Sequence, residues 1–340
     1  MPRFYPLTFI PVLKSYIWGG RGLADKLGRS LPPGIIAESW DISGHPNGIT
    51  AVANGPRSGL PLTTLQEMWG LDLVGRRAAW AHERGKFPLL IKLLDAATPL
   101  SVQVHPTDAY ALTHEGNELG KTEMWVVLRA DADAGIILGV SAGTTREQFR
   151  QALAAGQLEP HLHRLPVRAG DVVCVPAGTL HAILGGVIIA EIQQNSDTTY
   201  RVFDWNRLGA DGQPRPLHVD KALEVIDFRR IEPGLAQPCP AWQTDGARAM
   251  TLCQNPYFIT ERVEMDPGAR YEGAANGETL EIWGCIGGAA ALTGGGVRVP
   301  LPAVQFVLLP AAMGPFVVEA DGNAGTILLR TYLPAPEPMS

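Results

Sequence analysis

The chain has 340 residues, of which 46% are hydrophobic and 18% are charged, and its formal net charge is −6. This composition indicates a globular protein with a sizeable core, either two domains or one large β-rich domain, and argues against disorder. The acidic balance gives no reason to expect nucleic acid or an anionic membrane as a partner, although a small anionic substrate remains compatible with it.

The sequence shows no membrane-spanning segment, no secretory signal and no cysteine motif for metal binding. No apolar stretch approaches the roughly 20 residues of a membrane span, and residues 1–20 lack the apolar segment and cleavage site of a secretory signal. The four cysteines are scattered without a CxxC pair, so a cysteine zinc site is not indicated. We therefore expect a cytoplasmic protein without a membrane partner.

Helical patterns are confined to two stretches of the chain. Residues 60–85 and 144–165 carry helix-forming residues at helical spacing. In the second stretch, Thr144 or Thr145 is suited to cap the helix N-terminus, with Glu147 in the first turn. We expect these segments to be small helical insertions in an otherwise β-rich chain.

The stretch PLSVQVHP, residues 99–106, shows the alternation of a strand with one polar face. Ser101, Gln103 and His105 fall on one side, because successive side chains of a strand point in opposite directions. A hydroxyl, an amide and an imidazole on one face indicate a site rather than a packing surface.

Most other segments are short, rich in β-branched or apolar residues, and bounded by glycine and proline. Many such segments at close spacing predict a barrel or a sandwich. The clearest examples are AGIILGV, VRAGDVVCVPAG, GGVIIAEIQQ, YFITERVEM, TLEIWGCI, AVQFVLLPAA and GTILLRTYL.

GDVVCVPAGTLH, residues 170–181, has the spacing G-x5-P-x-G-x2-H. This spacing resembles the second sequence signature of cupin barrels, in which the histidine, here His181, points into the barrel as a metal ligand. The first cupin signature is altered, since Gln103-Val-His105 replaces its HxH pair and the nearest suitable glutamate is Glu123, in GKTEMW. The predicted fold class is therefore a mainly β, cupin-type antiparallel barrel or jelly roll.

The four side chains Gln103, His105, Glu123 and His181 would supply one amide oxygen, two imidazoles and one carboxylate. This mixed nitrogen and oxygen set suits one Zn²⁺ per chain with positions open for water or substrate, and Fe or Mn could occupy a similar set. The alternative is that His105 and His181 are separate polar residues with partners of their own.

A proline-punctuated stretch without periodicity, EPGLAQPCPAW, marks a domain boundary. We predict a metal-binding catalytic domain over residues 1–237 and a second cupin-like β domain over 238–340, which contains no histidine. Residues 172–184 and 306–318 align strand for strand, and Pro315 stands where the first segment has His181. The pair is either a duplicated β unit that lost its ligand or two unrelated strand–turn–strand units.

Several ordered blocks resemble the type I mannose-6-phosphate isomerase (phosphomannose isomerase) family in its short bacterial form. The resemblance extends from about residue 5 to 207, while the last hundred residues match only as a β-rich, cupin-like domain. It implies a zinc enzyme whose ligands fall on Gln103, His105, Glu123 and His181. The blocks are PVLKSYIWGG, AESWDISGHPNG, PLLIKLLDAATPLSVQVHP, GKTEMWVVL, VPAGTLHAI and EIQQNSDTTYRVFDW.

The same resemblance places the essential arginine of the family on Arg201, which could bind phosphate or stabilise an enediolate. Glu191 and Gln193 share one face of the strand VIIAEIQQ, and Glu191 is a candidate either for the general base or for support of a ligand histidine. Lys121 and Asp197 are further candidates for proton transfer. The remaining positions expected to contact substrate are Ser101, Lys92 and Arg207.

The resemblance implies an enzyme that interconverts mannose 6-phosphate and fructose 6-phosphate through a cis-enediol. A small phosphosugar is then the partner, and the oligomeric state is not specified by the sequence. The alternatives are a non-catalytic sugar-binding or regulatory cupin, an isomerase of another aldose, and a cupin oxidoreductase that uses iron and O₂. Lys121, Asp197 and Arg201 argue against the non-catalytic cupin, and the lysine and arginines around the site fit an anionic phosphosugar better than the oxidoreductase. An isomerase of an unphosphorylated aldose stays open.

Overall fold

The computed structural model describes residues 3–209, 212–322 and 325–335. The chain divides into two compact units, each assembled from separate stretches. The first unit comprises Met1–Val12, Trp40–Ile91 and Gln237–Ser340, and the second comprises Leu13–Ser39 and Lys92–Ala236. The predicted division into residues 1–237 and 238–340 stays a prediction, because the units follow spatial contacts rather than a single cut in the sequence.

Two antiparallel sheets build the second unit, and the unit boundaries fall within β2, β3 and β5. The first sheet has the strand order β10 (Val172–Val175), β7 (Glu123–Ala130), β12 (Val187–Gln194), β5 (Leu89–Ala96), β3 (Glu38–Ser43) and β2 (Val12–Lys14). The second sheet has the order β13 (Tyr200–Phe203), β6 (Val102–Val104), β11 (His181–Ile183), β8 (Gly135–Val140) and β9 (Leu162–Pro166).

Apolar residues fill the space between these two sheets and also cover the outer face of the second sheet. Leu94 and Trp125 of the first sheet form one cluster with Leu138 and Ile183 of the second. A separate cluster joins Val102, Val104, Ile137, Ala182 and Val202 to residues of α6 (Arg146–Ala154) and α7 (Val219–Val225). The alternation of β6, β11 and β13 thus directs one face toward the helices and the other toward the first sheet.

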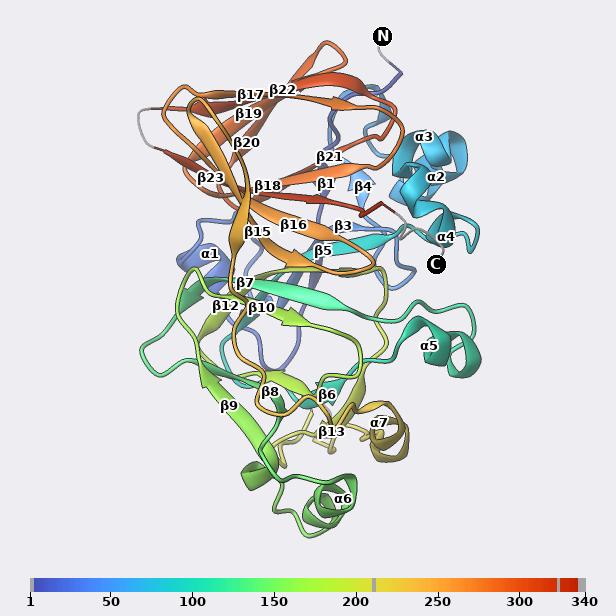
Figure 1. Cartoon of the computed structure of the whole chain (residues 1–340), viewed down its shortest axis with the longest axis vertical. Helices are drawn as coiled ribbons and strands as arrows, with labels where there is room; N and C mark the ends of the chain where they lie inside the picture. The colour runs from blue at the N-terminus through green and yellow to red at the C-terminus, as the bar shows by residue number, and fades with distance from the viewer. Residues whose placement is uncertain (1–2, 210–211, 323–324, 336–340) are drawn as a thin grey trace. The chain divides into compact units, whose positions relative to one another are not determined.

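The first unit contains a six-stranded and a four-stranded antiparallel sheet (Figure 1). The larger sheet has the order β14 (Cys239–Thr244), β15 (Ala247–Gln254), β16 (Ile259–Met265), β23 (Thr326–Tyr332), β18 (Glu281–Gly287) and β21 (Gln305–Leu309). The smaller sheet has the order β17 (Arg270–Ala275), β22 (Gly314–Asp321), β19 (Ala289–Gly294) and β20 (Val297–Pro302), and β1 (Phe9–Ile10) pairs with β4 (Ala51–Val52).

The predicted mainly β class with antiparallel sheets is confirmed, and in the described part of the chain the sheets stay open rather than closing into a barrel. Both strand–turn–strand segments noted in the sequence, residues 172–184 and 306–318, cross from one sheet of their unit to the other. This shared crossing agrees with duplication, which stays a hypothesis. None of the helices in the ranges described is long and apolar enough to cross a membrane.

The predicted helical stretch 60–85 is helical but broken. It contains α2 (Leu62–Trp69), α3 (Leu71–Val74), η2 (Arg76–Ala78) and α4 (Ala79–His82), which lie together in Figure 1. Gly70 and Gly75 interrupt it with φ angles of 51° and 88°, a backbone conformation that favours glycine. At Gly75 a side chain would also meet the backbone of Glu278 and Thr279 at 2.5 Å. Three short elements are η1 (Gly55–Arg57), α1 (Gly22–Asp25) and α5 (Asp108–His114).

The helical prediction for residues 144–165 is wrong in its second half. The helix α6 ends at Ala154, η3 covers Glu159–His161, and Leu162–Pro166 form the edge strand β9 paired with β8. Leu162 is buried in the cluster beneath α6, so the apolar residues of this stretch are shared between a helix and a strand. The spacing alone did not separate the two.

Thr145 caps α6 as predicted, through a reciprocal capping box. Its side chain accepts a hydrogen bond from the Gln148 backbone N–H at 3.2 Å, and the Gln148 side chain accepts one from the Thr145 N–H at 2.9 Å. Two otherwise unpaired N–H groups are satisfied in this way.

We expect Thr145→Ala to lower the free energy of unfolding by about 1 kcal/mol, because the Gln148 backbone N–H loses its acceptor, the Thr145 hydroxyl. Thr145→Ser keeps the hydroxyl and should stay close to the parent protein. Urea unfolding followed by circular dichroism measures both variants, and equal losses in the two would contradict the capping role.

Candidate active site

A cavity of about 290 Å³ lies within the second unit and is lined by 17 residues. Eight of them carry charge, in equal numbers of acids and bases: Glu38, Glu123, Glu191, Asp197, Lys92, Lys121, Arg201 and Arg215. Polar side chains come from Ser101, Gln103 and Thr199, and apolar ones from Tyr16, Trp18, Leu94, Leu100, Trp125 and Ile183. The cavity is therefore strongly polar on a scaffold that is otherwise apolar.

Strand register places one row of polar side chains on the inner face of the second sheet. Gln103 of β6 lies directly opposite His181 of β11 on one side and Arg201 of β13 on the other. Residues that face each other across antiparallel strands share a face of the sheet. Their neighbours Val102, Val104 and Ala182 point to the opposite face, which explains the polar alternation in PLSVQVHP.

The first sheet contributes acidic side chains by the same rule. Glu123 of β7 faces Gln193 of β12, and Trp125 faces Glu191 two residues further along. Glu123 and Glu191 therefore share the cavity face of this sheet, and both are buried.

Glu123 and the two histidines form a group that could hold a metal ion. His105, Glu123 and His181 each offer one ligand atom, and these three atoms lie within 4.8 Å of one another. His181 Nε2 is 3.3 Å from Glu123 Oε1, and His105 Nε2 is 3.5 Å from Glu123 Oε2. Glu123 is buried with both imidazoles at its carboxylate, and the Lys121 ammonium also lies 3.0 Å from its Oε2.

Backbone carbonyls orient both imidazoles toward the same point. His105 Nδ1 lies 2.8 Å from the Thr198 carbonyl oxygen, and His181 Nδ1 lies 2.9 Å from that of Thr179. A proton on each Nδ1 leaves the Nε2 lone pairs for a metal. Burial lowers the pKa of His181 to about 4, and burial followed by the charge of Lys121 lowers that of His105 well below its usual range. Both rings are neutral, as metal ligands must be.

Gln103 reaches the same place from the centre of β6. The Gln103 side-chain nitrogen, Nε2, lies 3.3 Å from His181 Nε2. Since amide oxygen and nitrogen are assigned from their surroundings, a half-turn of the group would present Oε1 there. Gln103 is thus placed to serve as a fourth ligand.

Hydrogen bonds between loops fix the approach of these residues. The Lys121 N–H donates to the Pro106 carbonyl at 3.0 Å and the Gly178 N–H donates to that of His105 at 2.9 Å. Asp108 accepts from the Gly120 N–H at 2.6 Å and from the Gln194 side chain at 3.1 Å. The loops that carry His105, Lys121 and the turn before His181 are therefore held as one body.

Lysines neutralise part of the acidic side of the cavity. Lys92 Nζ is 3.2 Å from Glu191 Oε1 and 3.6 Å from Glu38 Oε2, and Lys121 Nζ is 3.0 Å from Glu123 Oε2. Burial raises the pKa of Glu191, with the charge of Glu123 adding to the effect and Lys92 opposing it. Burial alone would lower the pKa of Lys92, but Glu191 and Glu38 outweigh it and raise the pKa.

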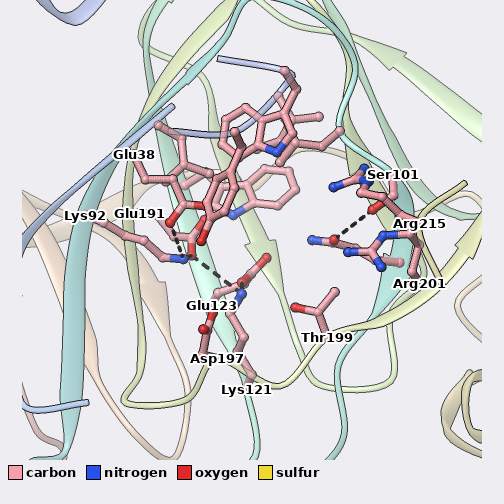
Figure 2. A pocket seen from close by; sticks show the side chains of 17 residues that line it. Glu38, Lys92, Ser101, Lys121, Glu123, Glu191, Asp197, Thr199, Arg201 and Arg215 are labelled. Atoms are coloured by element: carbon pink, nitrogen blue, oxygen red, sulfur yellow. Dashed lines mark hydrogen bonds and ion pairs between the residues drawn. The ribbon is translucent and has the colours of Figure 1, made fainter. Parts of the chain in front are cut away.

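Arginines occupy the other side of the cavity. Figure 2 shows Arg201 and Arg215 beside Ser101, across the cavity from Lys92, Glu38 and Glu191. Arg201 donates through Nη1 to the Pro216 carbonyl at 2.8 Å, while its buried Nε has no acceptor. Burial, together with the charge of Arg215, lowers the pKa of Arg201.

Known proteins establish the family of this chain. A family model for the catalytic domain of type I phosphomannose isomerase matches residues 7–124. A probable mannose-6-phosphate isomerase of Bacillus subtilis is 37% identical over 93% of this chain and 96% of its own length. The chain belongs to the type I phosphomannose isomerase family. A mannose-6-phosphate isomerase of Streptococcus mutans is 36% identical with the same coverage of both chains.

A solved structure supports the same assignment. The mannose 6-phosphate isomerase from Bacillus subtilis superposes with a TM-score of 0.84 at 35% identity, covering 96% of this chain and 99% of that one. The family resemblance, the cupin-type fold class and the identification as an isomerase enzyme are thereby confirmed.

Of the site residues predicted from the family resemblance, all but one come together. Gln103, Glu123, Lys121, Glu191, Asp197, Arg201, Ser101 and Lys92 line the cavity, and His105 and His181 meet Glu123 beside it. Arg207 lies outside the cavity lining, where its Nε donates to Asp204 at 3.0 Å and its Nη1 to the Pro99 carbonyl.

Sequence reasoning missed Arg215, Tyr16, Glu38 and Thr199, all of which line the cavity. Tyr16, Glu38 and Thr199 lie inside segments that resemble the family, so the resemblance could have indicated them. Arg215 lies in the loop between β13 and α7, where no strand pattern indicates its direction. Trp18 and Trp125 are buried and also form part of the cavity wall.

Asp204 forms ion pairs with Arg207 and Arg215 on the arginine side of the cavity. These ion pairs make the stability of the fold depend on pH. Burial alone would raise the pKa of Asp204, but hydrogen bonds from Arg215 and Arg207 outweigh it and hold the pKa below its usual value. A depressed carboxylate pKa stabilises the fold above the unfolded-state value of about 3.9, and this contribution disappears as the pH falls through the folded-state value.

We expect Asp204→Asn to be less stable than the parent protein near neutral pH, with the difference shrinking as the pH falls below about 4. Urea unfolding of both proteins across this range measures the difference in the free energy of unfolding. A difference that does not change with pH would contradict the role of the carboxylate charge.

Proposed function

We propose that this chain is a metal-dependent isomerase that interconverts mannose 6-phosphate and fructose 6-phosphate through a cis-enediol. The observation that supports this most directly is one cavity with a metal-binding group on one side and two arginines on the other. The reaction moves a proton between two neighbouring carbons of a sugar that carries a phosphate at its far end. Such a substrate needs both sides of the cavity at once.

The residues present fit a divalent metal ion. Two neutral imidazoles with their Nδ1 atoms held by carbonyls, the buried Glu123 carboxylate within 3.5 Å of both imidazoles, and an adjacent amide would hold it. We propose Gln103, His105, Glu123 and His181 as ligands and Zn²⁺ as the ion, because this nitrogen and oxygen set suits zinc. When bound, the ion would act as a Lewis acid on substrate oxygen or hold the sugar in place.

We propose Glu191 as the group that takes the proton from carbon. It does not support either ligand histidine, since both Nδ1 atoms are occupied by the carbonyls of Thr198 and Thr179. Glu191 is buried and lines the cavity, with its Oε1 3.2 Å and 3.8 Å from the Nζ atoms of Lys92 and Lys121. Burial raises the pKa of this carboxylate, and a carboxylate shielded from water beside the substrate suits proton abstraction.

The remaining cavity residues orient the sugar in this proposal. Lys121 and Asp197 lie beside the metal group and would bind hydroxyls or relay the proton between oxygens. Lys92 and Ser101 would contact the sugar from neighbouring strands. Arg201 would interact with the phosphate or the enediolate, since its guanidinium has an N–H without an acceptor. The cytoplasmic location and the lack of nucleic-acid and membrane partners stay predictions.

We expect His181→Ala to lose both bound metal and turnover of mannose 6-phosphate, because one of the two imidazole ligands is gone. Elemental analysis of the purified protein and a coupled assay with and without chelator measure these effects. His163→Ala is the matched control, since His163 lies on β9 with its Nδ1 bound to the Leu138 carbonyl at 3.0 Å. Full activity with metal retained in His181→Ala would remove the site assignment, and iron in place of zinc would correct the metal.

We expect Glu191→Gln to reduce kcat by about 100-fold to 10,000-fold while the metal content stays unchanged, because the amide cannot accept the proton. Exchange of the substrate C2 hydrogen with deuterated solvent should fall in parallel. Asp197→Asn serves as the comparison. If that variant loses exchange while Glu191→Gln keeps it, the base is Asp197.

A further inference from the structure

The arginine side of the cavity carries more positive charge than its surroundings neutralise. Three guanidinium groups, of Arg201, Arg207 and Arg215, gather near the single carboxylate of Asp204. Three positive charges against one negative charge leave an excess of two. A sugar phosphate carries a charge of about −1.5 to −2 at neutral pH, so a phosphate monoester would balance this side.

Arg207 and Arg215 share Asp204 but differ in what else they face. Their side chains are equally exposed, at 20% and 21%, and both form ion pairs with the 6% exposed carboxylate. Arg207 turns away, with Nη1 on the Pro99 carbonyl. Arg215 lines the cavity beside Arg201 and Ser101 (Figure 2).

The bond to Asp204 also sets the direction of the Arg215 guanidinium. Arg215 Nε donates to Asp204 Oδ2 at 2.7 Å and Nη2 donates to Oδ1, which leaves the Nη1 edge for a further acceptor. A β-bridge between Leu208 and Pro214 holds the backbone immediately before Arg215. A guanidinium held on one edge by a carboxylate is preorganised to bind an oxyanion on another.

We propose that Arg215, together with Arg201, binds the phosphate group of the substrate and determines the preference of this enzyme for phosphorylated sugars. Arg207, which the family resemblance indicated as a substrate contact, holds Asp204 and the Pro99 carbonyl instead. This inference rests on the proposed function for the identity of the substrate, but the anion site itself does not depend on turnover. Arg215 acts in binding, remote from the proton transfer, and its loss therefore falls mainly on KM.

The test compares Arg215→Ala, Arg215→Lys and Arg207→Ala with the parent protein, all loaded with metal. The KM for mannose 6-phosphate and the calorimetric Kd for inorganic phosphate are measured for each, alongside metal content. We expect Arg215→Ala to raise both constants about 10-fold to 100-fold, the range for a lost hydrogen bond to a charged group, with kcat and metal content changing little. Arg215→Lys keeps the charge and should recover part of the loss.

Arg207→Ala is the matched control, because it removes the same kind of bond to Asp204. We expect it to lower the unfolding midpoint as Arg215→Ala does, while the Kd for inorganic phosphate rises much less. The inference is overturned if Arg215→Ala leaves both constants unchanged, if Arg207→Ala shows the larger loss, or if inorganic phosphate does not bind the parent protein. Arg215-dependent phosphate binding without isomerisation of mannose 6-phosphate would support the anion site and overturn the proposed function.

Discussion

The need to balance charge that is buried between β-sheets governs the second unit. An ionised side chain in a low-dielectric interior is costly unless an opposite charge or a hydrogen bond compensates it. Here eight charged side chains line one cavity, and they are segregated rather than paired one to one. Four carboxylates with two lysines occupy the metal side, and two arginines occupy the other. The metal side is formally short of two positive charges, which is the charge of a divalent ion.

This segregation makes one side of the cavity negative and the other side positive. A dianion is attracted to the arginine side and repelled from the carboxylates, so a sugar phosphate is expected to enter in one orientation, with its carbonyl end toward the metal group. The apolar wall of Trp18, Trp125, Leu94, Leu100 and Ile183 keeps the local dielectric low, which strengthens these interactions. Orientation and polarisation of the substrate thus have one physical origin.

Strand register and hydrogen-bonded loops position the charged and polar side chains of the cavity. Arg201, Gln103 and His181 come from three separate strands, yet their pairing places them side by side across the sheet. His105 and Lys121 lie just beyond strand ends, where backbone hydrogen bonds to Gly178 and Pro106 replace strand pairing. The sheet therefore fixes half of the site and the loops fix the other half.

Sequence reasoning could predict the part of the site that strand spacing and family resemblance encode. Gln103 and His181 follow from alternation and from a spaced turn motif, and the structure places Gln103 3.3 Å from His181, which lies 3.3 Å from Glu123. The direction of a side chain in a long loop follows no such spacing rule. For this reason the sequence predicted Arg207 as a substrate contact and did not predict Arg215. The helical prediction for residues 144–165 was wrong in its second half for a related reason. Leu162 lies in a strand but packs in the same apolar cluster as α6, so its apolar character did not distinguish a strand from a helix.

A second pair of packed antiparallel sheets is present in the first unit, and the contrast with the cavity of the second unit shows what the site requires. There the space between sheets is filled by Trp283 and Phe316, with Tyr271 packed against them. Phe316 lies so close to Gly273 that a side chain at that glycine would meet the ring at 2.3 Å. Two packed sheets with a filled apolar core need no ligand. In the second unit large apolar residues form only part of the wall, and histidine, carboxylate and arginine side chains stand at matching registers among them. Binding function in this fold is therefore decided by a few inward-facing positions.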